Sequence, residues 1–169
     1  MTTLDSDGAL EDVLKRLRHL QPESKARWGR MNAHQMVCHL SDSFGLAMGL
    51  KSASEDISFL NRTVARWVAL HTAMPWPKGV PTRPEMDQFR GGTPPADFDR
   101  DTEVLARAMQ RFAGTPRSYS FARHPIFGEL TEWEWMRWGY RHADHHLRQF
   151  GLSGSNRTED RSKQSSATA

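Results

Sequence analysis

The stretch that decides the fold is "TEWEWMRWGYRHADHHLRQF", residues 131–150, which has the periodicity of one long helix. Thr131 is followed three positions later by Glu134, the spacing of a capping box at a helix N-terminus. Apolar side chains then recur at intervals of three and four residues, as they do on one face of a helix. This pattern predicts a buried face made of Trp133, Met136, Tyr140, Ala143, Leu147 and Phe150.

Earlier segments have the same periodicity, and helices are therefore expected over residues 9–20, 32–48, 55–73 and 101–113. The second has its own capping box, Asn32 with Gln35, and Ser54 is the expected cap of the third. The third helix is expected to turn inward Ile57, Leu60, Val64, Trp67 and Val68, and the fourth Val104, Leu105, Ala108 and Phe112. No segment alternates apolar and polar residues as a half-buried strand does, so the sequence predicts an all-α bundle.

Two segments lack helical periodicity. Residues 74–100 contain six prolines and a Gly91–Gly92 pair, which predict a long loop; because it holds Trp76 and Phe89, we expect it to pack onto the bundle. Residues 151–169 have almost no apolar side chains and are expected to be a disordered tail. One helical domain is therefore expected over residues 1–150.

Composition narrows the class of protein. The single cysteine among 169 residues excludes an internal disulfide and fits a reducing compartment. The N-terminus has no apolar run of a signal peptide, and no stretch approaches the ~20 apolar residues of a membrane span. The net charge is only +3, and no dense Lys/Arg run is present, so neither nucleic acid nor membrane is an expected partner. A cytoplasmic protein is expected.

The histidines are the candidate site. His142 and His146 lie four residues apart, so a helix places them one above the other beside the core face, whereas His145 is expected to point away. On the second helix His39 lies at the edge of the core face and His34 points to the far side. Three inward imidazoles at facing depths could bind Zn²⁺, Ni²⁺, Co²⁺ or Fe²⁺ and leave a position open. The alternative is that these histidines are structural and bond to carboxylates or main-chain carbonyls.

Several other residues are candidates for supporting roles. Gln149 follows His146 by three positions and could act in catalysis, by orienting a ligand or bonding to substrate, or be a polar helix-end residue. Asp42 and Asp144 are candidate hydrogen-bond acceptors for ligating histidines, although both lie away from the core faces. His124 begins the expected turn "HPIFG", and Cys38 is expected to be unreactive. Trp135 is a candidate pocket wall, and Trp133 and Trp138 are candidates for the core or a dimer surface.

These motifs carry a resemblance to a known superfamily. The segments "MNAHQMVCHLSDSF" and "RHADHHLRQFG" resemble the helix signatures of the DinB/YfiT-like metal-binding four-helix bundles, and "HPIFGELTEWEW" looks like a bacterial branch of unknown function. The resemblance covers about residues 9–150. It implies an up-down-down-up bundle in which His39, His142 and His146 bind a divalent metal, often zinc or nickel. The fifth helix and the long loop depart from the usual pattern.

The resemblance also implies a kind of chemistry. Characterised relatives include transferases and isomerases that use a low-molecular-weight thiol such as mycothiol or bacillithiol, and others are called hydrolases. We therefore expect a thiol S-transferase-like enzyme acting on a small-molecule electrophile. The alternatives are a metal-dependent hydrolase and a non-catalytic metal-binding or ligand-binding stress protein. Pairing through helix faces, as a homodimer, is also a possibility that the resemblance raises.

Overall fold

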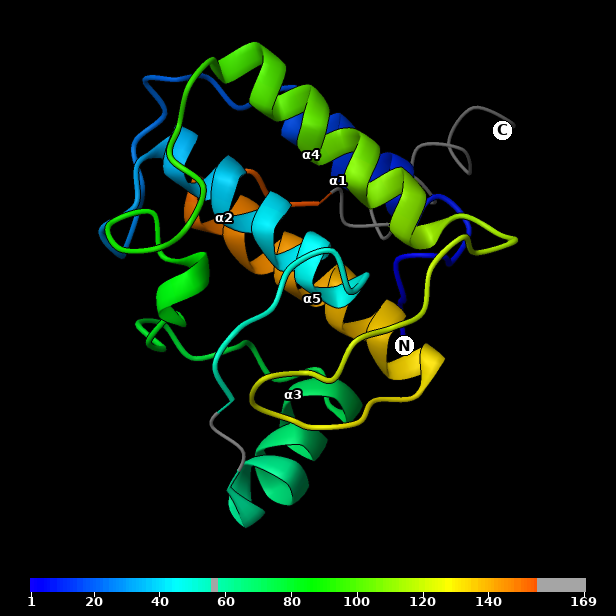
Figure 1. Cartoon of the computed structure of the whole chain (residues 1–169). Coiled ribbons are helices and arrows are strands. Elements are labelled where there is room, and N and C mark those ends of the chain that lie inside the picture. The colour runs from blue at the N-terminus through cyan, green and yellow to red at the C-terminus, as the bar shows by residue number, and fades with distance from the viewer. Residues whose placement is uncertain (56–57, 155–169) are drawn as a thin grey trace, which may run out of the picture.

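The computed structural model describes residues 1–55 and 58–154, and helices make up its framework (Figure 1). The five α-helices are α1 (Ala9–Leu17), α2 (Ala33–Ala47), α3 (Arg66–His71), α4 (Phe98–Ala113) and α5 (Glu132–Gln149). A π-helical segment, η1 (Asn61–Ala65), leads into α3, and a short 3₁₀ turn, η2 (Pro84–Met86), interrupts the long loop. The described ranges contain no strand beyond one isolated bridge, so the prediction of an all-α protein is confirmed.

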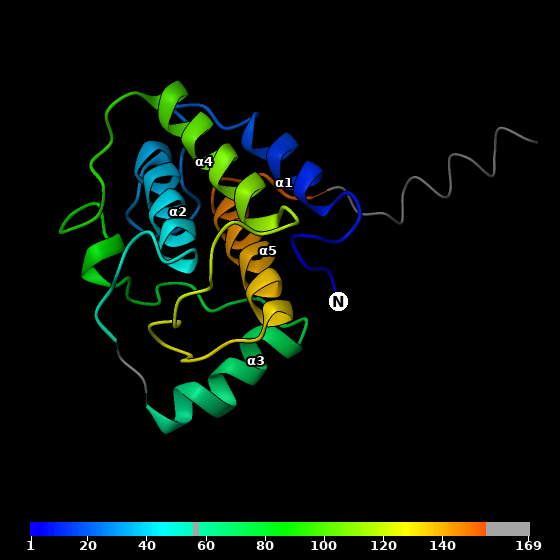
Figure 2. The ribbon, with the colours of Figure 1, turned by 45° about the vertical axis from the view of Figure 1, so that its right-hand side comes forward.

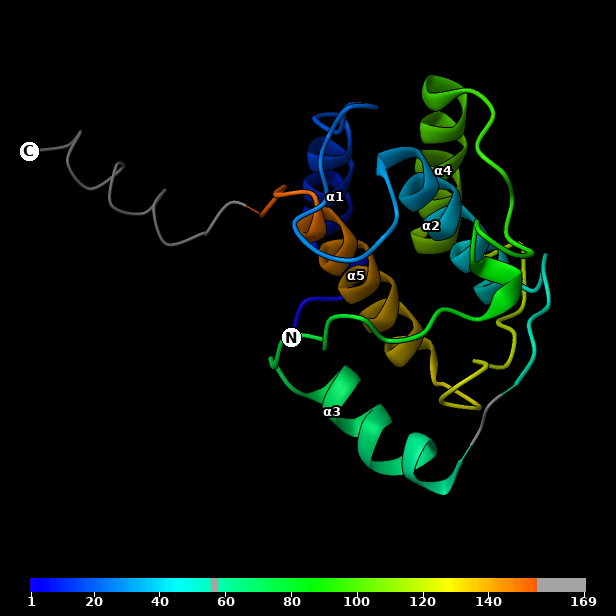
Figure 3. The ribbon, with the colours of Figure 1, turned by 90° about the vertical axis from the view of Figure 1, so that its left-hand side faces the viewer.

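Four of the helices pack around one core. Helices α1 and α2 each lie against both α4 and α5, as the turned view in Figure 2 also shows. Helix α3 lies outside this group, below the N-terminal half of α5 in Figure 3. The largest side chains with no solvent exposure include Phe44 of α2, Phe112 of α4 and Trp135 of α5. Gly139 lets α5 approach closely, because a Cβ there would lie 2.7 Å from Phe112.

Local capping fixes where the two site-bearing helices begin. The Asn32 side chain accepts a hydrogen bond from the Gln35 backbone N–H, and Thr131 accepts one from that of Glu134. Both capping boxes are complete, as predicted, because they satisfy donors that the first helical turn leaves unpaired. Helix α4 begins earlier than predicted, at Phe98, because Asp97 caps it through the Arg100 N–H. Helix α1 ends at Leu17 instead of residue 20.

The buried face of α5 differs from the predicted one. Trp133 is 40% exposed, whereas its neighbour Trp135 is fully buried. Trp135 stacks on Phe121, at 5.8 Å between ring centroids, because the loop before α5 folds back over that side of the helix. Trp138 is also buried and packs edge-on against Phe44. The periodicity correctly predicted that Met136, Ala143, Leu147 and Phe150 of this face are buried. It could not reveal that a loop covers the adjacent face of the helix and buries Trp135.

The segment around α3 gives a second correction. Its helical structure begins at residue 59, after Ser58 has accepted a hydrogen bond from the Asn61 N–H, so Ser54 is not its cap. The predicted inward residues Leu60, Val64 and Trp67 are 62, 56 and 59% exposed, and Ile57 lies outside the described residues. In this stretch only the last turn is deeply buried, through Leu70, because the helix crosses the end of α5 instead of joining the bundle. Val104 of α4 was also predicted inward and is 43% exposed.

The long loop packs onto α2, as expected. Its anchor is the buried carboxylate of Asp42, which accepts hydrogen bonds from the Thr93 N–H at 2.7 Å and from Gln88 at 3.0 Å and pairs with Lys51. The Trp76 indole N–H donates to the Ala69 carbonyl at 3.0 Å. Phe89, by contrast, is 49% exposed, because it lies under the guanidinium of Arg30 and not in the core.

The chain continues to pack beyond α5. Arg16 donates two hydrogen bonds to the Leu152 carbonyl, and Leu152 packs partly against the core. The remainder of the predicted tail, residues 155–169, lies outside the described residues. In the described part of the chain, no helix has the length and apolar character needed to cross a membrane.

Glu134 joins α3 to α5 and makes stability depend on pH. Burial alone would raise the pKa of this carboxyl, but hydrogen bonds from Arg66, Thr131 and His71 hold it at about 2, below the ordinary 4.5. A carboxyl whose pKa is lowered by folding stabilises the fold above the unfolded pKa and loses that effect as pH falls. We expect Glu134→Gln to lower the free energy of unfolding by about 1–3 kcal/mol at pH 7.

The measurement is urea unfolding of both proteins between pH 7 and pH 2. The difference between them should be constant above about pH 4.5 and shrink as pH falls toward 2, because Glu134 then becomes neutral in both states. The control is Glu103→Gln, which breaks the exposed Arg107–Glu103 pair within α4 and should cost under ~0.5 kcal/mol. An equal loss in the two variants would refute the assigned role of Glu134.

Candidate metal centre

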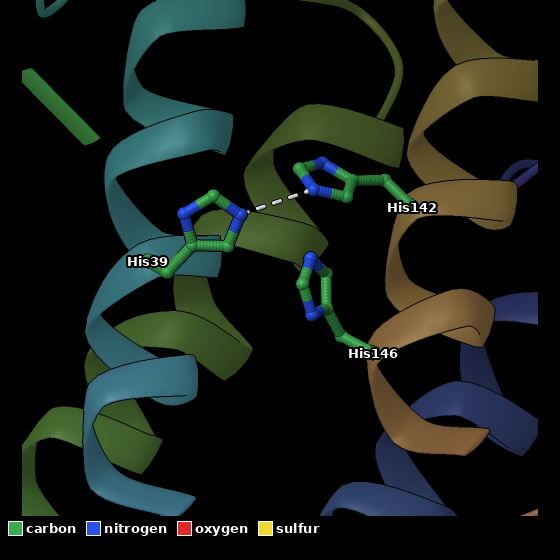
Figure 4. A group of neighbouring side chains, drawn as sticks. All are labelled: His39, His142 and His146. Carbon is green, nitrogen blue, oxygen red and sulfur yellow. Dashed lines mark hydrogen bonds between the residues drawn. The ribbon is translucent and has the colours of Figure 1, made fainter. Parts of the chain in front are cut away.

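Three histidines predicted to face the bundle interior meet between α2 and α5. His39 extends from α2, and His142 and His146 extend from α5 toward it (Figure 4). One ring nitrogen of each lies within 4.8 Å of the others. The Nε2 atoms of His39 and His142 are 3.2 Å apart. The geometry therefore brings together the three side chains that the helix wheels placed on facing sides.

His39 is held by the long loop. Its Nδ1 lies 2.8 Å from the main-chain carbonyl oxygen of Met86 in η2. A carbonyl oxygen only accepts hydrogen bonds, so Nδ1 carries the hydrogen and Nε2 keeps its lone pair. That lone pair faces the other two histidines (Figure 4). The loop thus fixes both the orientation and the tautomer of His39.

Gln149 holds His146 in a corresponding way. The Gln149 Oε1 accepts a hydrogen bond from His146 Nδ1 at 2.9 Å, while its Nε2 donates to the Trp28 carbonyl at 2.7 Å. Because a carbonyl oxygen only accepts, the bond to Trp28 identifies the amide nitrogen, and the amide oxygen therefore faces His146. The hydrogen of His146 is then on Nδ1, and its Nε2 is unprotonated. Gln149 is 3% exposed, and both ends of its amide have protein partners. Its structural role is to position His146.

His142 completes the group with fewer partners. Its Nδ1 is buried and has no hydrogen-bond partner among the described residues. Its ring lies against Trp138 at 4.8 Å and near Trp76 at 5.8 Å between centroids. Because its Nε2 faces the lone pair of His39, the gap between these two nitrogens must hold a proton or a cation.

The surroundings of the three rings favour their neutral forms, because burial lowers the pKa of each. Burial lowers the pKa of His39, and it lowers the pKa of His142 and His146 well below the usual value, with the neighbouring histidines adding to the effect. No carboxylate among the described residues bonds to them. Asp42 anchors the long loop, and Asp144 pairs with Arg16 and Arg148, so neither is the acceptor that the sequence suggested.

His34 and His145, which the sequence placed on the solvent side, have protein contacts instead. His145 is half-buried and lies 5.8 Å from Trp28 and 6.1 Å from Trp76 between ring centroids, because the flanking loops cover that face of α5. His34 lies 2.7 Å from Asp101 on α4.

Cys38 lies beside the carboxylate of Asp101, which also contacts His34. Its thiol is 3.7 Å from Asp101, and burial followed by the Asp101 charge raises its pKa to about 12. His34, Cys38 and Asp101 offer a second set of close donor atoms, but Asp101 also accepts the Ala96 N–H and so fixes the entry to α4. A thiol with so high a pKa is unreactive at neutral pH, as expected from the sequence.

The three histidines open onto a large cavity of about 1000 Å³. Its aromatic wall includes Trp28, Trp76, Phe127 and Trp138, whereas Trp135, the predicted wall, is buried behind Trp138. Several methionines and the charged residues Arg30, Arg83, Arg90 and Asp87 also line it. Small-molecule sites have volumes of ~300–1,000 Å³ with apolar walls and a few polar groups, and this cavity belongs to that class.

The donor set fits a divalent cation. Two neutral imidazoles have their Nδ1 hydrogens bonded to fixed oxygens, which is how protein metal ligands are usually oriented. Three imidazoles facing a cavity correspond to the catalytic class of site, since structural zinc is closed by four protein ligands. The residues present therefore suit Zn²⁺ or Ni²⁺ with a position left for an exogenous ligand.

Comparison with known protein families gives a match over most of the chain. The family model described as a protein of unknown function, DUF1569, matches residues 3–152, nearly all of the described chain. No curated protein and no solved structure matches the chain.

Gly29 provides a test of the contact that holds Gln149. A Cβ at Gly29 would lie 2.6 Å from the Gln149 Nε2, and its φ of +78° adds backbone strain. Gly79 has a similar φ of +75° but nothing within 4 Å, so Gly79→Ala is the matched control. Both substitutions should lower the free energy of unfolding by about 1 kcal/mol through backbone strain. Gly29→Ala should lower it by about 1–2 kcal/mol more, because of the clash with Gln149. Chemical unfolding measures this difference, and equal losses would contradict the close contact with Gln149.

Proposed function

The chain belongs to the DUF1569 family, whose function is unknown, and we propose from its site that it is a divalent-metal-dependent enzyme acting on small molecules. The convergence of His39, His142 and His146 on a large aromatic cavity is the observation that supports this proposal most directly. The reaction proposed is transfer of a thiol to an electrophilic small molecule. The relation to the DinB/YfiT-like superfamily, with its up-down-down-up topology, is part of the same proposal.

The chain's residues have distinct parts in this reaction. When bound, a divalent ion with an open position lowers the pKa of a coordinated thiol or water, so that it becomes a nucleophile near neutral pH. The three histidines supply neutral donors, and Met86 and Gln149 keep two of them in the ligating tautomer. The tryptophans exclude water and hold the apolar part of a substrate.

The size of the cavity favours transfer over hydrolysis. A hydrolase needs room for one substrate and a water molecule, whereas a transferase must hold a thiol and its acceptor together. About 1000 Å³ lies at the upper end of the range for single small ligands, and therefore leaves room for two. Cys38 is not the nucleophile in this scheme, because its thiol is buried beside Asp101 and its pKa is raised to about 12.

The first test is metal content. Protein purified without a chelator should contain about one zinc or nickel per chain, and His39→Ala, His142→Ala or His146→Ala should abolish this stoichiometry because each removes one donor. His34→Ala and His145→Ala remove histidines outside the group and should keep the metal. Elemental analysis gives the result. A metal-free protein that takes up no added divalent ion would leave the three histidines as structural residues.

Gln149 should affect metal affinity without being a ligand. Gln149→Met keeps the length of the side chain but removes the acceptor of His146 Nδ1 and the donor to Trp28. Loss of such a partner typically lowers metal affinity about 10–100-fold. Competition with a chromophoric chelator measures this, while saturating metal should still bind one ion per chain. Unchanged affinity would show that His146 needs no orienting partner.

A further inference from the structure

His124 is a buried histidine outside the three-histidine group. It stands at the start of the turn "HPIFG", which is closed by two main-chain hydrogen bonds of 2.9 Å between His124 and Gly128. Gly128 has a φ of +74°, the left-handed conformation that lets the turn reverse tightly. The residue is 5% exposed and lines the same cavity as the three histidines. A rigid turn therefore places an imidazole at the cavity wall.

The turn also decides where the His124 proton sits. Its Nδ1 accepts hydrogen bonds from the backbone N–H groups of Ile126 at 3.1 Å and Phe127 at 3.0 Å. A nitrogen that accepts two N–H donors cannot carry a hydrogen itself, so the hydrogen is on Nε2. Burial lowers the pKa of His124 to about 3, which keeps the ring neutral. The tautomer is thus opposite to that of His39 and His146, which carry their hydrogen on Nδ1.

The ring is immobilised, yet its N–H is free. Phe127 stacks on it at 4.5 Å, and Trp135 and Trp138 pack beside it at 5.4 and 5.8 Å between centroids. Among the described residues, no acceptor bonds to His124 Nε2. This nitrogen is also not fully enclosed by protein atoms. His124 lines the cavity, and Nε2 is the ring nitrogen that its turn leaves unbonded. Trp138 contacts both His124 and His142, at 5.8 and 4.8 Å between ring centroids.

We propose that His124 is the substrate-binding hydrogen-bond donor of the cavity, and that its Nε2–H binds a carbonyl or carboxylate oxygen of a molecule held at the three-histidine group. This inference rests on the proposed function. It names the substrate class more closely. The thiol or the electrophile should carry a carbonyl or carboxylate oxygen near its reacting atom. A neutral donor fixed before binding loses little entropy when it bonds, and it stays a donor across the physiological pH range.

The first arm of the test uses metal-free protein and so does not depend on the metal. Two-bond ¹H–¹⁵N spectra of histidine-labelled protein should show His124 as the Nε2–H tautomer from pH 5 to pH 8. Its Nε2 resonance should move on titration with acetate. An Nδ1–H tautomer, protonation within this range, or a resonance that acetate does not move would overturn the proposal.

The second arm measures binding beside the metal. His124→Asn retains an acceptor for the turn's backbone N–H groups but lacks the distal donor. In cobalt-loaded protein, this variant should bind mercaptoacetate about tenfold more weakly than the wild type, while its affinity for ethanethiol stays the same. Thiolate-to-cobalt absorption reports both affinities, and an equal change for the two thiols would overturn the proposal. Thermal unfolding confirms that the variant is folded, and His19→Asn, an exposed histidine, is the control.

The two arms separate this proposal from the proposed function. Failure to take up cobalt would contradict the metal-dependent function, and the acetate titration would then decide the role of His124 alone. Cobalt uptake with no difference between the thiols would leave the metal site standing and remove His124 from substrate binding.

Discussion

The hydrogen bonds at the Nδ1 atoms of His39 and His146 are the interactions on which the candidate site depends. A neutral imidazole has one donor and one acceptor nitrogen, so an oxygen placed at Nδ1 decides what Nε2 presents. The oxygens come from the Met86 main chain and the Gln149 side chain. Without them, each buried ring could turn or change tautomer, and the three nitrogens would not offer lone pairs to one point.

These acceptors belong to segments whose positions are themselves fixed by distant contacts. Asp42 and Arg30 bind the long loop just after η2 and so hold the Met86 carbonyl in place, and Gln149 is aligned by the Trp28 carbonyl. Residues of the same segments line the cavity, so the loops that form its walls also orient His39 and His146.

His124 shows the same principle with the opposite result. Its Nδ1 accepts from the backbone of its own turn, so its Nε2 presents a hydrogen instead of a lone pair. The cavity therefore has electron-pair donors from α2 and α5 and a hydrogen-bond donor from the loop before α5. A ligand with a soft or basic atom at one end and an oxygen acceptor nearby would match both.

The sequence by itself determined the helices with strong caps and the side of its helix on which each of His39, His142 and His146 lies, because capping and the 3.6-residue period act within a few neighbouring residues. It failed where a contact comes from elsewhere in the chain: Trp135 is buried instead of Trp133, and Trp67 is exposed. The tertiary structure alone decided the hydrogen-bond partners of the clustered histidine rings, since Met86 lies 47 residues from His39. A main-chain carbonyl is the same in every residue, so no sequence pattern identifies the one that folding brings to a histidine.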